Sequence, residues 1–149
     1  MADHVTKQAL DQLVSVLIAG ATDAADRIYA GRITPFANDE LPAINVTGGP
    51  EELNLASIHS PAFLERAATI EIACHTGAAD SYDADAYALL KQVEHLVAAN
   101  PTLSEQVKSI APTAITWERE ADAAVPVVRA TLVLRAELLT MNNAVDVPV

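Results

Sequence analysis

The sequence predicts an α+β domain in which helices lie on a largely antiparallel, mixed sheet of about four to five strands. Long segments carry apolar residues at the spacing of an amphipathic helix, and other segments alternate apolar and polar residues as half-buried strands do. The expected order is helix, three strands, two helices, two strands. Helices and strands that do not alternate regularly favour an antiparallel sheet with helices on it over a parallel α/β fold.

The N-terminal part of the chain predicts one helix and two short strands. Apolar residues recur at helical spacing over Thr6–Ala19, where Thr6 is the expected N-cap because its hydroxyl can accept a free backbone N–H. Strands are expected near residues 27–33 and over residues 43–47. A Gly-Gly-Pro sequence follows the second strand and predicts that it stops there, so residues 47–64 are expected to be a loop.

The middle of the chain predicts a strand and two helices. Residues 66–75 alternate cleanly, with Ala68, Ile70, Ile72 and Cys74 on one face. A long helix is expected to start after residue 85 and to end at an Asn-Pro pair. Thr102 and Glu105 then have the spacing of a capping box, which predicts a short second helix that carries Leu103, Val107 and Ile110 up to Pro112.

Two strands are expected to close the domain as a hairpin, over residues 113–120 and 127–138. Ile115, Trp117 and Arg119 are expected to share one face of the first of them. Residues 140–149 are expected to form a C-terminal tail that can be flexible. The chain has 149 residues and 15.7 kDa, which fits a single domain over residues 1–149.

Composition excludes several functional classes. Hydrophobic residues make up 51% of the chain and charged residues 19%, which is unlike a disordered polypeptide. A net charge of -11 repels phosphate backbones and anionic lipids, so nucleic-acid and membrane binding are not expected. A single cysteine cannot form an intrachain disulfide, and the N-terminal residues do not resemble a signal peptide. We therefore expect the protein to work in a reducing cytoplasm. No apolar run is long enough to predict a transmembrane helix.

No set of residues predicts an enzyme or a cofactor site. Cys74 and His75 are adjacent on a predicted strand, so their side chains point to opposite faces and cannot form a nucleophile and base pair. His4, His59 and His95 have no nearby His or Cys partner of the kind that zinc sites use. No glycine-rich phosphate loop is present. We therefore expect no catalytic residue, no cofactor and no resident metal.

Two charged groups have more than one interpretation. Asp80, Asp83 and Asp85 precede a helix, where acids complement the positive end of the dipole, but their spacing could also hold a divalent cation weakly across a subunit interface. The second group could be a solvated sheet face or could meet another subunit; its members are Glu118, Arg119, Glu120, Asp122, Arg129, Arg135 and Glu137.

The order of motifs resembles the phage tail terminator proteins, in particular the minor tail protein U family of long-tailed phages. The motifs are Arg-Ile-Tyr-Ala-Gly-Arg at 27–32, Asp-Glu-Leu-Pro-Ala-Ile-Asn-Val at 39–46, the alternating strand from residue 66, Ala-Asn-Pro-Thr-Leu at 99–103 and Trp-Glu-Arg-Glu-Ala-Asp at 117–122. The resemblance runs from about residue 5 to 137. The predicted loop at 47–64 and the C-terminal tail depart from the family pattern.

The resemblance implies a structural virion protein, assembled in the host cytoplasm, that forms a hexameric ring on the end of the tail tube. Such a ring stops tube polymerisation and presents a surface to the head-tail connector, and DNA passes through it without being bound. Closed rings need a heterologous interface, in which two different patches of each subunit meet. The residues expected at subunit or tube interfaces are Arg27, Arg32, Asp39, Glu40, Arg66, Glu71, Asp80, Asp83, Asp85, Glu118, Arg119 and Glu120.

The segment at residues 27–46 fits such an interface, because two prolines stiffen its backbone and a stiff surface loses little entropy on docking. The alternative interpretation is that Pro35 and Phe36 cap the core and the arginines are solvated. Two other functional classes stay open. A head-tail connector or neck protein would bind the portal instead of tube ends. A small enzyme of unfamiliar type would show a pocket with perturbed pKa values.

Overall fold

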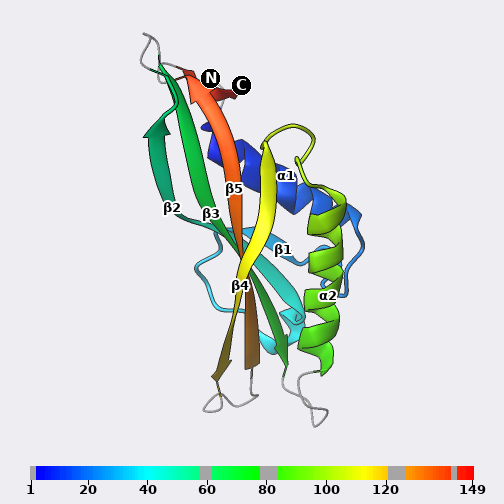
Figure 1. Cartoon of the computed structure of the whole chain (residues 1–149). Helices are drawn as coiled ribbons and strands as arrows, with labels where there is room; N and C mark the ends of the chain where they lie inside the picture. The colour runs from blue at the N-terminus through cyan, green and yellow to red at the C-terminus, as the bar shows by residue number, and fades with distance from the viewer. Residues whose placement is uncertain (1–2, 58–61, 78–83, 121–126, 142–143) are drawn as a thin grey trace.

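A computed structural model describes residues 3–57, 62–77, 84–120, 127–141 and 144–149. It confirms the α+β class, with two α-helices and one mostly antiparallel sheet (Figure 1). The elements, in chain order, are α1 (Val5–Ala19), β1 (Ile28–Ala30), the 3-10 turn η1 (Asn38–Glu40), β2 (Ala43–Leu55), β3 (Phe63–Gly77), α2 (Ala84–Ala99), β4 (Ser109–Glu120), β5 (Val127–Met141) and β6 (Ala144–Pro148).

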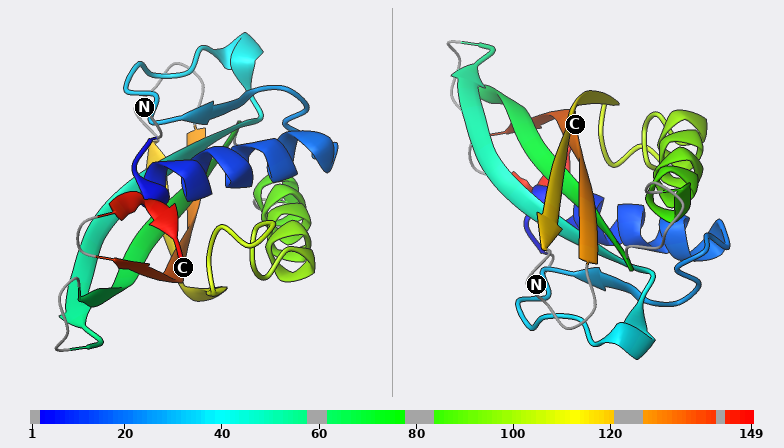
Figure 2. Two further views of the ribbon diagram at one scale, coloured as in Figure 1. Left: turned by 90° about the horizontal axis from the view of Figure 1, so that it is seen from above. Right: turned by 90° about the horizontal axis from the view of Figure 1, so that it is seen from below.

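The strands form one sheet in the order β1-β2-β3-β5-β4, and β6 pairs with the end of β5. β1 pairs with β2 in parallel, and all other neighbours are antiparallel. Both helices lie on the same face of the sheet, α1 against β1 and β2 and α2 against β3 and β5 (Figure 2). No helix of the described residues lies on the opposite face, and the β2–β3 pair reaches beyond the helices at one end of the molecule (Figures 1 and 2).

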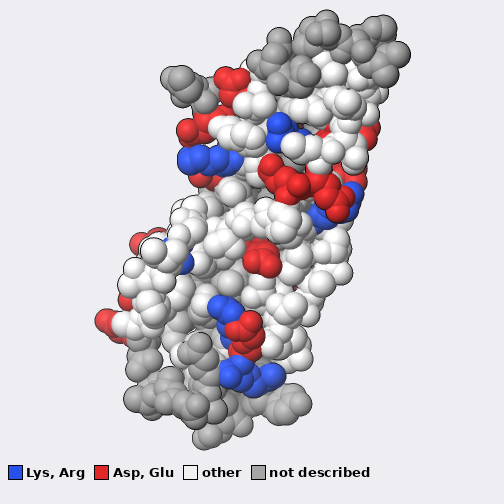
Figure 3. Space-filling model, turned by 90° about the vertical axis from the view of Figure 1, so that its left-hand side faces the viewer, with Lys and Arg blue, Asp and Glu red and all other residues white. Residues whose placement is uncertain are grey.

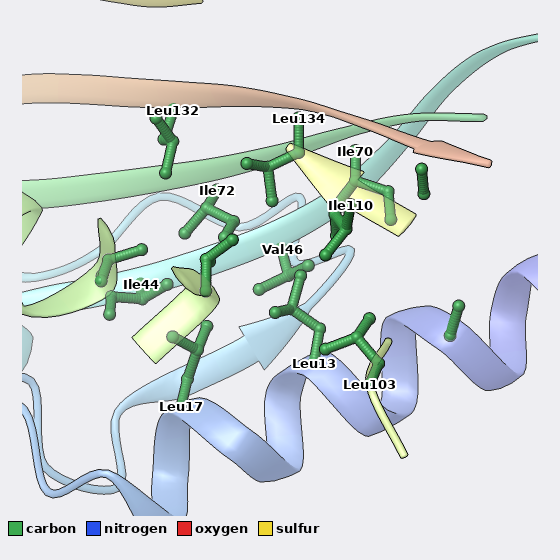
Figure 4. Close-up of a cluster of buried hydrophobic side chains, with 14 of the residues drawn as sticks. Leu13, Leu17, Ile44, Val46, Ile70, Ile72, Leu103, Ile110, Leu132 and Leu134 are labelled. Carbon is green, nitrogen blue, oxygen red and sulfur yellow. The ribbon is translucent and has the colours of Figure 1, made fainter. Parts of the chain in front are cut away.

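The core lies between the two helices and the covered face of the sheet. Leu13 and Leu17 of α1 lie opposite sheet side chains such as Ile70 and Leu132, and all four are fully buried (Figure 4). The alternation predicted for residues 66–75 is confirmed, because every second residue of that part of β3 is buried. Burying each large aliphatic side chain contributes roughly 1.5–3 kcal/mol, so this layer provides most of the driving force for folding.

The prediction of a loop at residues 47–64 is wrong for its first part. β2 continues to Leu55 and pairs with β3 along its length. A register shift between Gly48 and Glu51 places Gly49 and Pro50 in a bulge, where neither has a partner on β3. The missing N–H of a proline removes no ladder hydrogen bond at a bulge, so the strand passes through the sequence that was expected to stop it.

The prediction of a short second helix from residue 102 up to Pro112 is also wrong. The Glu105 amide does donate to Thr102 Oγ1 at 3.4 Å, as a capping box requires. Leu103, Ser104 and Glu105 nevertheless have φ of 47°, 56° and 67°, which is the left-handed region and does not propagate a right-handed helix. The turn buries Leu103 and Val107 in the core and leads directly into β4, so tertiary packing decides its conformation.

Two smaller expectations change at the ends of the chain. The N-cap of α1 is His4, whose Nδ1 accepts from the Thr6 amide at 3.2 Å, so Thr6 itself is not the cap. The segment expected to be a tail contains the end of β5 and the strand β6, and Gln8 Nε2 donates to the Asp146 carbonyl at 2.8 Å. Neither helix of the described chain is long and apolar enough to span a bilayer.

Candidate assembly surface

Two exposed apolar side chains of the sheet lie on a projecting arm, which we define as residues 51–55 of β2 and 63–67 of β3. Leu53 and Leu55 are 53% and 69% exposed, and they pair in register with Arg66 and Leu64. The bulge in β2 shifts the alternation, so both leucines lie on the helix side of the sheet. This end of the β2–β3 pair projects beyond the helices (Figure 2). The arm therefore presents uncovered apolar surface.

A buried ionic cluster holds the base of this arm. Arg66 is only 6% exposed, and its guanidinium lies 3.5 Å from a Glu51 carboxylate oxygen and donates to Thr140 Oγ1 at 3.0 Å. The Thr6 hydroxyl of α1 donates to the same Glu51 carboxylate. The cluster joins α1, both strands of the arm and β5, so Arg66, which the sequence placed at an interface, has its partners inside the subunit.

Two strand edges of the sheet have no partner among the described residues. β4 is the last strand of the sheet, and the outer edge of β2 pairs with β1 only at residues 44–46. Ile115 of β4 is 41% exposed and lies on the helix side of the sheet together with Trp117 and Arg119, as the sequence predicted. An open strand edge presents a row of backbone donors and acceptors that can pair with another chain.

The segment around residues 31–41 is held together by Arg32. Its guanidinium donates to both carboxylate oxygens of Glu40, at 2.7 and 3.1 Å, and to the carbonyls of Thr34 and Pro35. Its carbon also lies 4.3 Å from the centre of the Phe36 ring. The backbone of Arg32 exchanges two hydrogen bonds with the Asn45 side chain, which fixes the segment to β2.

The contacts between the charged groups of this segment shift their pKa values. Hydrogen bonds from Arg32 and then from the Ala37 amide hold the pKa of the Glu40 carboxyl below its usual range. The same contact with Glu40 raises the pKa of the Arg32 guanidinium. Arg27 also acts within the subunit, because its Nε donates to the Pro42 carbonyl at 2.9 Å. The stiff entry to β2 is therefore produced by arginines that contact their own chain.

A groove of about 460 Å³ lies on the helix-free face of the sheet, between the Arg32 segment and β5. Its lining includes His75, Glu71 and Arg129, which forms an ion pair with Glu118 across the β4–β5 pairing. The His75 ring lies 4.8 Å from that of Phe36. Partial burial, and secondarily the charge of Arg129, lowers the pKa of His75 to about 4, so this histidine is neutral at pH 7.

The other predicted interface residues are scattered. Asp39 is exposed on η1, and Asp85 is exposed in the first turn of α2. Arg119 lies over the Trp117 ring at 5.5 Å. Asp80 and Asp83 lie outside the described residues, and so does the Glu120 side chain at the end of β4. Glu118 and Glu71 are thus brought to one groove, whose lining includes neither Asp39 nor Asp85.

Among the described residues, no group of three or more His, Cys, Asp or Glu side chains is placed to hold a metal ion. Cys74 is buried in the core, and burial raises the pKa of its thiol to about 12. It lies on the helix side of β3, and His75 lies on the other face, as expected from their adjacency on a strand.

Charges of both signs lie close together on the side of the molecule that carries the β2 edge (Figure 3). Arg135 contacts Glu52 and Glu137 at 3.9 and 3.6 Å, although all three side chains are well exposed. Exposed pairs of this kind stabilise a fold by less than about 1 kcal/mol each. Sequence reasoning missed Leu53 and Leu55, because the strand that exposes them was expected to be a loop.

The part of the chain that the structure describes has one helix-covered sheet, two open strand edges and a projecting apolar arm. No protein-family model and no curated protein matches the chain. Among solved structures, the chain is similar to one from the "Virion of native gene transfer agent (GTA) particle", at 20% identity over 92% of each chain and with a TM-score of 0.43. A likeness of this size carries no argument about function.

Proposed function

We propose that this protein is a structural component of a phage or phage-like virion: a tail terminator that forms a ring, a hexamer by resemblance, on the end of the tail tube. The observation that carries the proposal is the projecting arm, whose Leu53 and Leu55 are 53% and 69% exposed. Apolar side chains gathered at such a site mark a surface that another protein covers. The whole-chain order of sequence motifs supports the terminator class in particular.

In this proposal the ring stops the growth of the tube and offers its other side to the head-tail connector. The tail is assembled in the host cytoplasm, and the protein becomes part of the virion tail. The net charge of -11 supports passage of DNA through the ring without retention, because the phosphate backbone is repelled. The protein acts by binding, without a catalytic residue or cofactor; a divalent cation bridging acids of neighbouring subunits is a further element of the proposal.

The proposal is tested by tube capping. The protein is added to polymerising tail-tube protein from the same phage or prophage, and tube length and tube ends are examined by electron microscopy. Wild type is expected to stop elongation and to form a ring at tube ends. The Leu53→Asp/Leu55→Asp variant is expected to lose capping, because it places two carboxylates on the surface that must be covered.

The matched control is Ile18→Gln, which alters a side chain that is 45% exposed on α1, away from the arm. It is expected to cap tubes as wild type does. Loss of capping in both variants, with both folded, would remove the arm from the function. Binding of wild type to the portal instead of tube ends would replace the terminator by a connector, and binding to neither would exclude both.

A further inference from the structure

The structure points to how the ring closes, an inference that rests on the proposed function. We propose that the outer edge of β4 in one subunit pairs, as an antiparallel strand, with the outer edge of the β2 part of the arm in the next subunit. The partner is a second copy of this chain. The contact is heterologous, as a closed ring of more than two subunits requires.

Both edges are regular where they would meet, and neither has a strand partner there among the described residues. Residues 114–120 of β4 pair with β5 without interruption, and residues 51–55 of β2 pair with β3 in the same way. The features that normally protect an edge, a proline and a bulge, lie outside these stretches, at Pro112 and at Gly49 and Pro50. Each stretch is therefore open to an added strand.

Strand direction agrees with ring symmetry. β2, β3, β5 and β4 follow one another with antiparallel pairing at each step, so β2 and β4 run in opposite directions. A rotation about the ring axis keeps the sense in which each strand runs along that axis, and it does so also when the strands are tilted against the axis. It therefore brings β4 of one subunit beside an oppositely directed β2 of the next, and the pairing stays antiparallel around the whole ring.

One register joins the exposed apolar side chains of the two edges. On the helix side of the sheet it places Ile115 opposite Leu55 of the neighbour, and Trp117 opposite Leu53. Two residues further along, it places Arg119 opposite Glu51, which adds a pair of opposite charges. Directly opposed side chains in adjacent strands contact each other, so this register covers Leu53, Leu55 and Ile115 at once.

On the other face the same register places Thr116 opposite Asn54 and Glu118 opposite Glu52. The two carboxylates each have an arginine of their own subunit beside them, Arg129 and Arg135. Within one subunit, Leu55 lies at the level of Thr140 on β5, whereas Ile115 lies at the level of Leu132. Placing Leu55 opposite Ile115 of the next subunit therefore displaces neighbouring subunits along the strands. A closed sheet has such a stagger.

The register is tested by disulfide cross-linking in the full chain. The double variant Leu55→Cys/Ile115→Cys places two thiols directly opposite each other, at a separation that a disulfide can bridge. The native Cys74 is buried and does not compete. Under mild oxidation we expect a ladder of covalent oligomers that ends at the ring size, measured on a non-reducing gel. The control Asn54→Cys/Ile115→Cys places the thiols on opposite faces and is expected to stay uncrosslinked.

The outcomes separate this inference from the proposed function, because particle mass of the reduced variants reports ring formation independently. A ring without the ladder, or with equal cross-linking of the control, overturns the register and leaves the terminator function in place. Strong dimer formation by Ile115→Cys alone overturns it in favour of a two-fold β4–β4 contact. A protein that neither forms rings nor caps tubes removes both the inference and the function.

Discussion

Arginine side chains show how far a residue's role depends on its neighbours in space. Arg27, Arg32 and Arg66 were expected to offer positive charge to another subunit. In the structure Arg32 binds Glu40 with both ends of its guanidinium, and Arg66 is buried against Glu51 and Thr140. A planar guanidinium with five donors suits such multiple contacts, which lysine could not reproduce. These residues thus shape the assembly surface from within the subunit.

The lowered pKa of His75 predicts that the stability of the fold depends on pH. Its pKa is lowered from 6.5 to about 4, so the unfolded chain binds a proton at this site at higher pH than the folded chain does. Stability should therefore fall as pH decreases from about 6.5 to about 4, and this contribution should be constant above that window.

The measurement is the free energy of unfolding by urea at several pH values, for wild type and for His75→Phe. The variant keeps an aromatic ring beside Phe36 and cannot titrate. We expect wild type to lose more stability than the variant over this window. Both lose further stability at lower pH as Glu40, whose pKa is also lowered, becomes protonated. Parallel curves for the two proteins would show that His75 is not held neutral by its surroundings.

Strands and helices were predictable where their own side-chain pattern is strong. α1, β3, α2 and β5 each show a regular period over ten or more residues, and each appears in the structure close to its expected bounds. β2 beyond Thr47 has no such period, and the turn after α2 has a local signal that packing overrides. Pro50 is tolerated because it lies in the bulge of β2, where it has no hydrogen-bonding partner on β3. No local sequence pattern predicts that register shift.

The packing of α1 on the sheet predicts which of its side chains stabilise the protein. Leu13 is fully buried, whereas Ile18 is 45% exposed on the same helix. Leu13→Ala should destabilise the protein by about 2–5 kcal/mol, because it removes buried methyl groups and leaves a cavity.

The matched Ile18→Ala should change stability by less than about 0.5 kcal/mol, since surface substitutions away from special features have small effects. Both values come from chemical denaturation followed by circular dichroism. Equal losses in the two variants would contradict the placement of α1 on the sheet.

The charge of the whole molecule should control how subunits associate. Each subunit carries a formal charge of -11, so copies repel each other at low ionic strength even where local pairs are complementary. Raising the salt concentration from about 0.01 to 0.15 M shortens the screening length from about 30 to 8 Å. Self-association should therefore strengthen over this range.

Sedimentation of the purified protein across that salt series measures the effect. The Lys7→Gln variant, whose exposed lysine lies on α1, serves as a comparison in which the net charge is one unit more negative. Its association should need slightly more salt than that of wild type. Weaker association at higher salt would show that specific ion pairs, such as the proposed one between Arg119 and Glu51, dominate the interface.

The sequence by itself determined the α+β class, the main helices and strands, the buried face of β3 and the placement of Cys74 and His75 on opposite faces of that strand. These follow from the period of apolar side chains along one segment, which local geometry converts into a buried face. Only the tertiary structure decided that β2 passes through Pro50, that Arg32 and Arg66 bind within their own subunit, and that Leu53, Leu55 and Ile115 are left exposed. Each of these depends on which strand lies beside which, and residues distant in sequence set that arrangement.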